Sequence, residues 1–235
     1  MKIPTFSKLF DHSILRPDAT KEMLLAAADT AVRLKTASLT VQPHYLRLAA
    51  GRLKGTGVLV GTVIGFPQGN ETAAMKEQQT NIAINLGAEE IDMVMNIPAL
   101  KNGEQELFVA DIAGVVRAAK GAKVKVILEN CYLNDEEKKR ACQWIVRAGA
   151  HFVKTSTGYA AGGATVADIR LMHDSVQGKC EVKAAGGVRE LPEILEYLKA
   201  GATRFGSTRT DQFVAAFRKL SPEERKPYGE YLAEL

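Results

Sequence analysis

Three charged residues interrupt segments of the sequence that otherwise have the composition of buried β-strands. They are Asp92 in the run Glu90–Val94, Lys154 in His151–Ser156 and Lys183 in Glu181–Ala185. Strands of an all-parallel sheet are covered on both faces, so a charge inside one requires a partner or a function. A single such lysine is more often a structural ion pair or a strand-end residue that reaches solvent. All three charges, however, lie toward the C-terminal ends of their runs, where parallel barrels build active sites, and together they favour one catalytic site.

The two lysines indicate nucleophilic chemistry on a carbonyl group. A lysine amine attacks a carbonyl only when it is neutral, so its pKa must fall from ~10.4 to near 7, which costs roughly 4 kcal/mol. A second ammonium group about 6 Å away contributes about 3 kcal/mol of repulsion at an effective dielectric constant of ~20, and partial burial adds to it. Lys154 and Lys183 fall on neighbouring expected strands, so the pattern predicts that Lys183 lowers the pKa of Lys154. Lys123 and Lys125 lie at the start of their run, and we assign them no role.

Glycine-rich segments after the expected strands form a second group of candidate residues. They are Thr157-Gly158, Gly162-Gly163-Ala164-Thr165, Gly186-Gly187 and Gly206-Ser207-Thr208. Barrels commonly hold a phosphate group in the loops after strands seven and eight, where backbone amides surround it. Any one glycine pair is more often only a turn, so the prediction depends on several pairs meeting at one place. The expected phosphate-binding residues are Gly158, Gly186, Gly187, Gly206, Ser207 and Thr208.

Short β-rich runs alternate with amphipathic helical segments along the chain. The runs are Lys8–Asp11, Ala37–Val41, Gly57–Phe66, Glu89–Met95, Lys123–Glu129, His151–Ser156, Cys180–Ala184 and Thr203–Gly206. Helix starts are marked by Asn134 with Glu137 and by Thr165 with Asp168, which have the spacing of an N-cap and an N3 residue. Helix ends are marked by glycines that fit a left-handed residue after the last turn, namely Gly55, Gly87, Gly121, Gly149, Gly178 and Gly201.

Eight repeats of strand, loop, helix and glycine require parallel strands joined by right-handed crossovers. Eight units in 235 residues are close to the usual size of a (β/α)8 TIM barrel, an α/β fold. An open doubly wound sheet is the alternative, but no G-x-G-x-x-G motif follows an early strand. No linker-like segment interrupts the chain, so we expect one TIM-barrel domain over residues 1–235.

Composition excludes several classes of protein. The net charge of +4 comes from 31 basic and 27 acidic residues with no basic stripe, so no nucleic-acid partner is expected. No apolar run approaches the ~20 residues of a membrane span, and the start lacks a signal peptide, which predicts a cytoplasmic protein without a membrane partner. The cysteines Cys131, Cys142 and Cys180 have no C-x-x-C spacing, which favours a reducing compartment.

The sequence contains no recognisable motif for metal binding or for catalysis by a serine nucleophile. The four histidines form no H-x-x-x-H or H-E-x-x-H arrangement, so no metal site is predicted. There is no G-x-S-x-G motif either. His12 is the only histidine near an expected strand end, and we interpret it as a core or orienting residue rather than a catalytic one.

Five ordered segments resemble the deoxyribose-phosphate aldolase family, and the match runs from about Asp11 to Thr208. The segments are Asp11–Leu15, Val63–Gly69, Gly87–Asn96, Phe152–Gly158 and Val182–Val188. The resemblance implies a class I aldolase that interconverts 2-deoxy-D-ribose 5-phosphate with acetaldehyde and D-glyceraldehyde 3-phosphate. It implies no metal or organic cofactor, and a phosphosugar and aldehydes as the small-molecule substrates.

The same resemblance assigns roles to the charged residues. Lys154 forms the Schiff base, Asp92 shuttles protons, and Lys183 lowers the pKa of Lys154 and joins the relay. Asp11 holds Lys183, and Ser13 occupies the position of a substrate-contacting hydroxyl. Asp11 and Ser13 thus complete the expected substrate-binding set.

The chain also departs from the family pattern. Thr40 stands where the family often has a cysteine, Arg209 follows the last glycine segment where a small residue is common, and the chain does not end in the tyrosine of some members. Whether Tyr228 or Tyr231 replaces that tyrosine stays open. Two alternatives also stay open, another lysine-dependent aldolase or transaldolase, and a phosphate-binding barrel without Schiff-base chemistry. The oligomeric state is not readable from the chain, so a homo-oligomer remains an option.

Overall fold

Eight parallel strands close into a barrel in the computed structural model, which describes residues 5–229. The strands are β1 (Phe10–Ile14), β2 (Ser38–Val41), β3 (Leu59–Ile64), β4 (Glu90–Val94), β5 (Lys123–Ile127), β6 (Phe152–Lys154), β7 (Glu181–Ala185) and β8 (Arg204–Ser207). Each strand pairs with the next in sequence, and β8 pairs with β1, so the described sheet has no free edge. The (β/α)8 TIM barrel expected from the sequence is confirmed.

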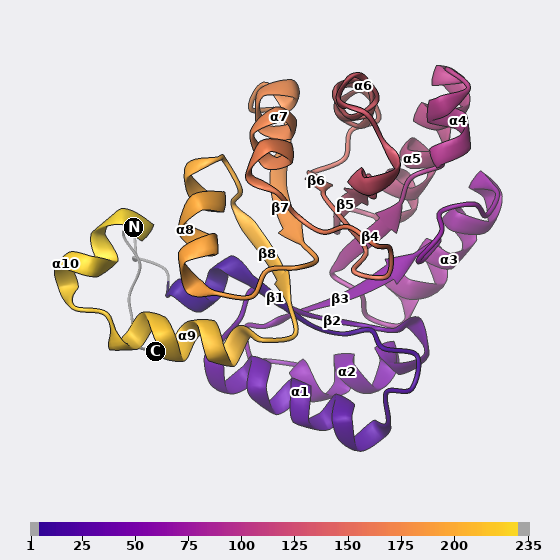
Figure 1. Ribbon diagram of the computed structural model, residues 1–235. Coiled ribbons are helices and arrows are strands. Elements are labelled where there is room, and N and C mark those ends of the chain that lie inside the picture. Colours follow the sequence, from indigo (N-terminus) through magenta and orange to yellow (C-terminus); the bar gives the residue numbers. More distant parts are fainter. Residues whose placement is uncertain (1–4, 230–235) are drawn as a thin grey trace.

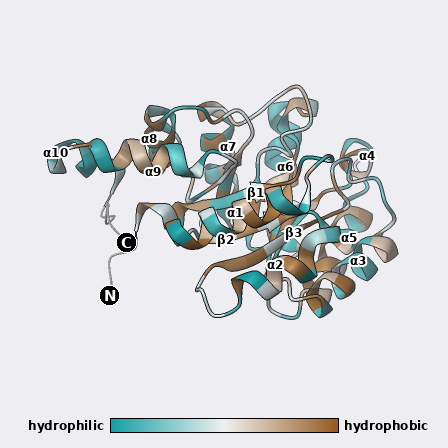
Figure 2. Cartoon of the chain, turned by 90° about the horizontal axis from the view of Figure 1, so that it is seen from below, coloured by the Kyte–Doolittle hydropathy of each residue, from teal (hydrophilic) through white to brown (hydrophobic). Residues whose placement is uncertain are grey.

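Helices surround the strands on all sides (Figure 1). They are α1 (Lys21–Leu34), α2 (Leu46–Leu53), α3 (Ala73–Asn85), α4 (Ile97–Lys101), α5 (Gln105–Ala118), α6 (Asp135–Arg147), α7 (Val166–Val176), α8 (Leu191–Lys199), α9 (Thr210–Lys219) and α10 (Pro222–Arg225). Hydrophobic residues dominate β3 in Figure 2, while hydrophilic residues recur along the helices. Within residues 5–229, none of these helices has the length and apolar composition needed to cross a bilayer.

The expected helix boundaries are confirmed where the sequence carries capping residues. Asn134 and Glu137 form a reciprocal capping box at the start of α6, and the Thr165 hydroxyl accepts the Asp168 amide at the start of α7. All six glycines expected to end helices have a positive φ, such as +101° at Gly87. Each therefore adopts a conformation that residues with a side chain rarely reach.

The expected first strand, Lys8–Asp11, is wrong at both ends. A short 3-10 helix occupies Phe6–Leu9, and the strand runs from Phe10 to Ile14 instead. The aromatic ring of Phe6 stacks on Phe217 of α9 at 3.9 Å between ring centroids. This aromatic packing holds Phe6–Leu9 outside the sheet. The strand therefore begins later than expected, at Phe10, and includes both His12 and Ser13.

The interior of the barrel is charged rather than apolar. Alternate residues of a strand point to opposite faces, and the outward positions, such as Ile91, Met93 and Val153, are fully buried beneath the helices. The inward positions include Asp11, Glu90, Asp92, Lys125, Lys154, Lys183 and Arg204. Strand register places Asp92 beside Lys125 and Lys154 beside Lys183. The barrel thereby concentrates its charges in a space that water hardly reaches.

Candidate active site

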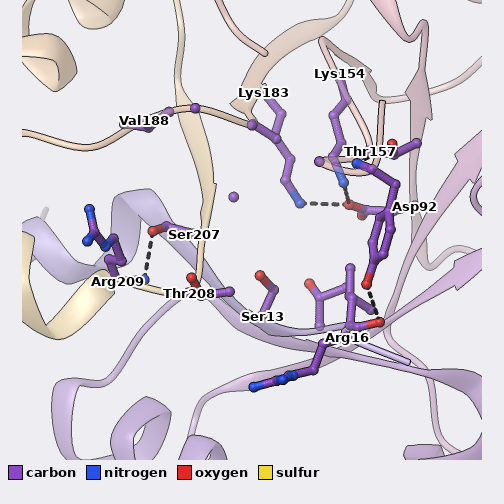
Figure 3. A pocket seen from close by; sticks show the side chains of 18 residues that line it. Ser13, Arg16, Asp92, Lys154, Thr157, Lys183, Val188, Ser207, Thr208 and Arg209 are labelled. Atoms are coloured by element: carbon purple, nitrogen blue, oxygen red, sulfur yellow. Dashed lines mark hydrogen bonds and ion pairs between the residues drawn. The ribbon is translucent and has the colours of Figure 1, made fainter. Parts of the chain in front are cut away.

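Asp92 lies at the centre of the charged cluster. Its Oδ2 atom is 2.8 Å from Lys154 Nζ and 2.7 Å from Lys183 Nζ, and its Oδ1 atom is 3.0 Å from Lys125 Nζ. The side chain of Asp92 is completely buried and those of the lysines nearly so. Figure 3 shows Lys154 and Lys183 converging on this carboxylate from neighbouring strands. The three charged residues singled out in the sequence thus meet at one point.

A second layer of charges lies deeper in the barrel. Asp11 Oδ2 is 2.6 Å from Lys183 Nζ and 3.2 Å from Lys125 Nζ, and Asp11 Oδ1 accepts from Arg204 at 2.7 Å. Glu90 is 2.6 Å from Lys125 Nζ and 3.5 Å from Arg204. Asp11 therefore contacts Lys183, as the family resemblance implied. It is fully buried and does not line the pocket above it.

The cluster contains more cations than anions. Lys125, Lys154, Lys183 and Arg204 supply four positive charges, whereas the carboxylates Asp11, Glu90 and Asp92 supply three negative ones. Burying an uncompensated charge is costly, so one base should give up its proton. Lys154 makes the fewest ion pairs of the four, a single one with Asp92, so its deprotonation balances the cluster with the loss of the fewest ion pairs.

The pKa values follow this balance. Burial, together with the nearby charges of Lys183 and Lys125, lowers the pKa of Lys154 to about 8 against the opposing effect of Asp92. The pKa of Lys125 is shifted in the opposite direction. Burial would lower it, but the charges of Asp11, Asp92 and Glu90 outweigh burial and raise it above the ordinary value. Burial would raise the pKa of Asp92, yet the lysines outweigh it and hold that pKa far below the usual range. Lys154 is thus the readily deprotonated amine of the cluster.

A pocket of about 410 Å³ opens above the lysines at the carboxyl ends of the strands. Of the residues proposed from the sequence, those that line it are Ser13, Asp92, Lys154, Gly158, Lys183, Gly186, Gly187, Gly206, Ser207 and Thr208. Residues with no role in the sequence-based site also line it, among them Leu15, Arg16, Thr157, Tyr159, Ala185 and Val188. Figure 3 shows Val188, Ser207 and Thr208 on one side and Lys154 with Asp92 on the other.

The glycine segments bring the loops of the pocket close together. Gly186 and Gly187 have φ values of +79° and +76°, and the Gly186 carbonyl accepts the Ala164 amide at 2.9 Å. A Cβ atom on Gly163 would lie only 2.5 Å from the Gly186 carbonyl oxygen. At Gly206 a Cβ would lie 3.2 Å from Lys183 Cε. These glycines therefore permit contacts between loops and beside the lysine that a side chain would disturb.

The interpretation of Lys125 as a residue without a role is wrong. It is fully buried, and it links Asp11, Glu90 and Asp92 through one ammonium group. Lys123, two residues earlier, is half exposed, and its carboxylate contact is a long one of 4.0 Å to Glu181, so it lies apart from the buried cluster. Sequence reasoning also missed Glu90 and Arg204. The available signal was the two-residue period of a strand, because Glu90 must share the face of Asp92.

Several other residues lie away from the chemistry. His12 faces outward, its Nδ1 is 3.1 Å from the Thr210 hydroxyl, and burial lowers its pKa to about 4, consistent with its interpretation as a core residue. Cys131 is exposed and does not line the pocket. Tyr228 packs against Phe6 and Phe217 and likewise does not line the pocket, while Tyr231 falls outside the described residues.

No group of three or more histidine, cysteine, aspartate or glutamate side chains is arranged to hold a metal ion in the part of the chain that the structure describes. The side chains that line the pocket supply an amine nucleophile, a carboxylate, hydroxyl groups and the guanidinium groups of Arg16 and Arg209.

A closed (β/α)8 barrel with a readily deprotonated lysine at the carboxyl ends of its strands has the architecture of a lysine-dependent barrel aldolase. Residues 5–208 match the model of the DeoC/LacD family aldolases, and the chain belongs to this family.

Relatives and solved structures agree with the family assignment. A Staphylococcus epidermidis deoxyribose-phosphate aldolase is 50% identical over 208 residues, which cover 88% of this chain and 94% of that protein. A deoxyribose-phosphate aldolase from Listeria monocytogenes serotype 4a is 47% identical over 220 residues, which cover 93% of this chain and 99% of that protein. The structure of the tetrameric deoxyribose phosphate aldolase from Aeropyrum pernix superimposes with a TM-score of 0.84 at 29% identity over 92% of each chain.

Proposed function

We propose that this protein is a class I aldolase that reversibly cleaves 2-deoxy-D-ribose 5-phosphate into acetaldehyde and D-glyceraldehyde 3-phosphate. The substrate is proposed from relatives about half identical to this chain that are named for it. The observation that carries the chemistry is Lys154, whose amine lies in the pocket with a pKa lowered to about 8. At pH 7 roughly one such amine in ten is neutral, compared with fewer than one in a thousand for an ordinary lysine.

In the proposed first step, the neutral Lys154 amine adds to the aldehyde carbon C1 of the open-chain sugar. The carbinolamine then loses its hydroxyl as water, which leaves a protonated imine between Lys154 and C1. Asp92 is the general acid and base for these transfers, directly or through one water, because its Oδ2 is 2.8 Å from the reacting nitrogen. Lys183 shares that oxygen at 2.7 Å and can return a proton to it.

In the second step the imine accepts electrons from the breaking bond. The C3 hydroxyl gives up its proton, the C2–C3 bond breaks, and its electron pair moves toward the iminium nitrogen, forming an enamine. D-Glyceraldehyde 3-phosphate leaves with the former C3 as its aldehyde carbon. Protonation of the enamine at C2 and hydrolysis of the resulting imine release acetaldehyde and restore the Lys154 amine.

The phosphate end of the substrate is assigned to the glycine loops. Gly186 and Gly187 follow β7, and Gly206, Ser207 and Thr208 end or follow β8, the two positions where barrels commonly bind phosphate. Gly158 lies in the loop after β6 and lines the same pocket. Ser13 projects from β1 between this end and the lysines, where its hydroxyl can contact the sugar. Asp11 acts beneath the pocket by holding Lys183.

Borohydride trapping tests the proposal. Incubation with acetaldehyde and sodium borohydride should add one reduced two-carbon group to Lys154, located by peptide mass spectrometry. Lys154→Arg keeps the positive charge and serves as the control that should not be labelled. An adduct on another lysine would place the Schiff base elsewhere. An adduct formed with dihydroxyacetone but not acetaldehyde would indicate a different aldolase or a transaldolase.

The proposal includes the assembly and conditions of the enzyme. The proposed enzyme needs no metal or organic cofactor, so EDTA should leave its activity unchanged. It works as one barrel domain in the cytoplasm, which the three free cysteines support. A homo-oligomer is included because the Aeropyrum pernix relative is described as tetrameric. Light scattering coupled to size-exclusion chromatography measures the oligomeric state directly, and a monomer would remove that part of the proposal.

A further inference from the structure

Arg209 places a guanidinium group at the rim of the pocket. It follows Ser207 and Thr208 in the loop between β8 and α9, lines the same pocket and is exposed. Its backbone amide donates to the Ser207 hydroxyl at 2.9 Å, which fixes the start of the loop. Figure 3 shows Arg209 beside Ser207, on the side of the pocket opposite Asp92 and Lys154.

The guanidinium of Arg209 is not engaged by the protein. Three other cations line the pocket, and each has a carboxylate partner. Lys154 and Lys183 contact Asp92, and Arg16 donates to Asp18 at 2.6 Å. Within residues 5–229, the Arg209 side chain makes no hydrogen bond, ion pair or ring contact with any other group. Its five donors are therefore free to bind a ligand in the pocket.

The remaining groups at this end of the pocket are neutral donors. The amides of the glycine loops and the hydroxyls of Ser207 and Thr208 can donate hydrogen bonds to a phosphate but supply no full positive charge. The N-terminus of α9 would favour an anion, but Asp211 in its first turn opposes one. A phosphate monoester carries nearly two negative charges at pH 7. Among the lining residues at this end of the pocket, Arg209 is the one that carries a positive charge.

We propose that Arg209 is a specificity-determining residue that binds the phosphate of the sugar phosphate and selects phosphorylated over unphosphorylated substrates. A guanidinium pairs two N–H groups with two phosphate oxygens, a geometry that an ammonium group does not reproduce. The inference rests on the proposed function, because it assumes that the reacting carbon lies at Lys154 and the phosphate at the glycine loops. The five-carbon substrate then extends across the pocket from Lys154 to Arg209.

The test compares Arg209→Gln with the wild-type enzyme on deoxyribose 5-phosphate and on unphosphorylated deoxyribose. A lost charge-assisted contact should lower kcat/KM for the phosphorylated sugar about ten- to hundredfold, mainly through KM, and leave deoxyribose within about twofold. Arg209→Lys should recover part of the loss. Arg170→Gln removes the same charge from an exposed position on α7 outside the pocket. It should leave kcat/KM unchanged for both substrates.

Calorimetric titration with inorganic phosphate gives a readout that does not depend on turnover. The dissociation constant for phosphate should rise about tenfold or more in Arg209→Gln and stay unchanged in Arg170→Gln. Equal proportional losses on both sugars, or an unchanged phosphate affinity, would overturn the role of Arg209. If wild-type enzyme cleaves neither sugar and gives no borohydride adduct, the proposed function fails instead, and the phosphate titration still decides whether Arg209 binds an anion.

Discussion

Lys154 and Lys183 donate hydrogen bonds to the same oxygen atom, Asp92 Oδ2, at 2.8 and 2.7 Å. The shared acceptor holds the two amines close together, so each positive charge is felt strongly by the other. Lys183 also contacts Asp11, whereas Lys154 has no second carboxylate. The second carboxylate contact of Lys183 is thus what distinguishes the two lysines, and Lys154, with a single carboxylate partner, is the amine whose pKa is lowered to about 8.

Replacing Lys183 by methionine should raise the pKa of Lys154. Burial is the largest cause of the lowered pKa of Lys154, and the charge of Lys183 contributes to the value of about 8, so removing that charge shifts the pKa upward. We expect kcat to fall at least about a hundredfold, with the residual activity moved to higher pH. The measurement is a pH profile of kcat/KM. Lys199→Met, an exposed change on α8, is the control, and coincident profiles of all three enzymes would show that the two lysines do not interact.

Replacing Asp92 by asparagine should separate imine formation from turnover. Asp92 raises the pKa of Lys154, so without it that pKa falls further and a larger share of the amine is neutral and nucleophilic. Slow trapping of acetaldehyde on Lys154 should persist over a long incubation, because water can replace Asp92 as acid and base in forming the imine, whereas turnover should fall about a thousandfold or more because its proton transfers have lost Asp92. Borohydride labelling and steady-state kinetics on the same sample give both quantities. Loss of labelling in a folded variant would mean that Asp92 is required before the imine forms.

Lys125 should matter for folding rather than for binding substrate. Its ammonium group joins Asp11, Glu90 and Asp92 in the barrel, so Lys125→Met leaves buried carboxylates with fewer partners. Breaking such a buried pair costs about 3 to 5 kcal/mol. Lys123→Met, on the exposed start of the same strand, should cost less than about 1 kcal/mol. Urea denaturation of both variants measures the difference, and equal stabilities would show that Lys125 is not a structural partner.

The sequence predicted the barrel and the meeting of Lys154, Lys183 and Asp92, but not the charges beneath them. Periodicity and glycine spacing are local signals, and the shared end of parallel strands brings distant residues together without further information. Lys125 was missed because its importance depends on register. In a strand covered on both faces, composition does not tell inward from outward positions, and only the pairing of Asp92 with Lys125 places that lysine inside.

The boundary of the first strand was also not predictable from the sequence. The apolar residues Phe6, Leu9 and Phe10 fit a strand as well as a turn of helix. The choice is made by aromatic packing between Phe6 and Phe217, which are more than 200 residues apart in sequence. Such contacts override local preference, so the boundary of β1 and the place of Ser13 within it required the structure.

Replacing Lys154 by methionine should abolish activity and stabilise the fold at neutral pH. The pKa of Lys154 is about 8 in the folded chain and 10.5 for an ordinary lysine, so below pH 8 folding is opposed by about 3 kcal/mol. Between pH 8 and 10.5 the unfolded chain binds more protons, and wild-type stability therefore rises with pH. Lys154→Met should gain about 1 to 3 kcal/mol at pH 7, and the gain should shrink by pH 10. Urea denaturation at both pH values checks this, and a less stable variant at pH 7 would contradict it.

Thr40 should protect the enzyme from concentrated acetaldehyde. The enamine proposed to form on Lys154 would add a second acetaldehyde, and dehydration of that product would give an α,β-unsaturated aldehyde inside the pocket. Such an electrophile bonds irreversibly to a nearby thiolate, but Thr40, which lines the pocket with a buried hydroxyl, offers none. Thr40→Cys should therefore be inactivated several times faster than wild type in acetaldehyde, with a mass increase on that cysteine.

Cys131→Ser is the matched control. Cys131 is exposed outside the pocket, so replacing it should not change the half-life of the enzyme in acetaldehyde. Equal half-lives for wild type and Thr40→Cys would remove the protective role of Thr40, and a longer half-life for Cys131→Ser would move the vulnerable site to the β5–α6 loop.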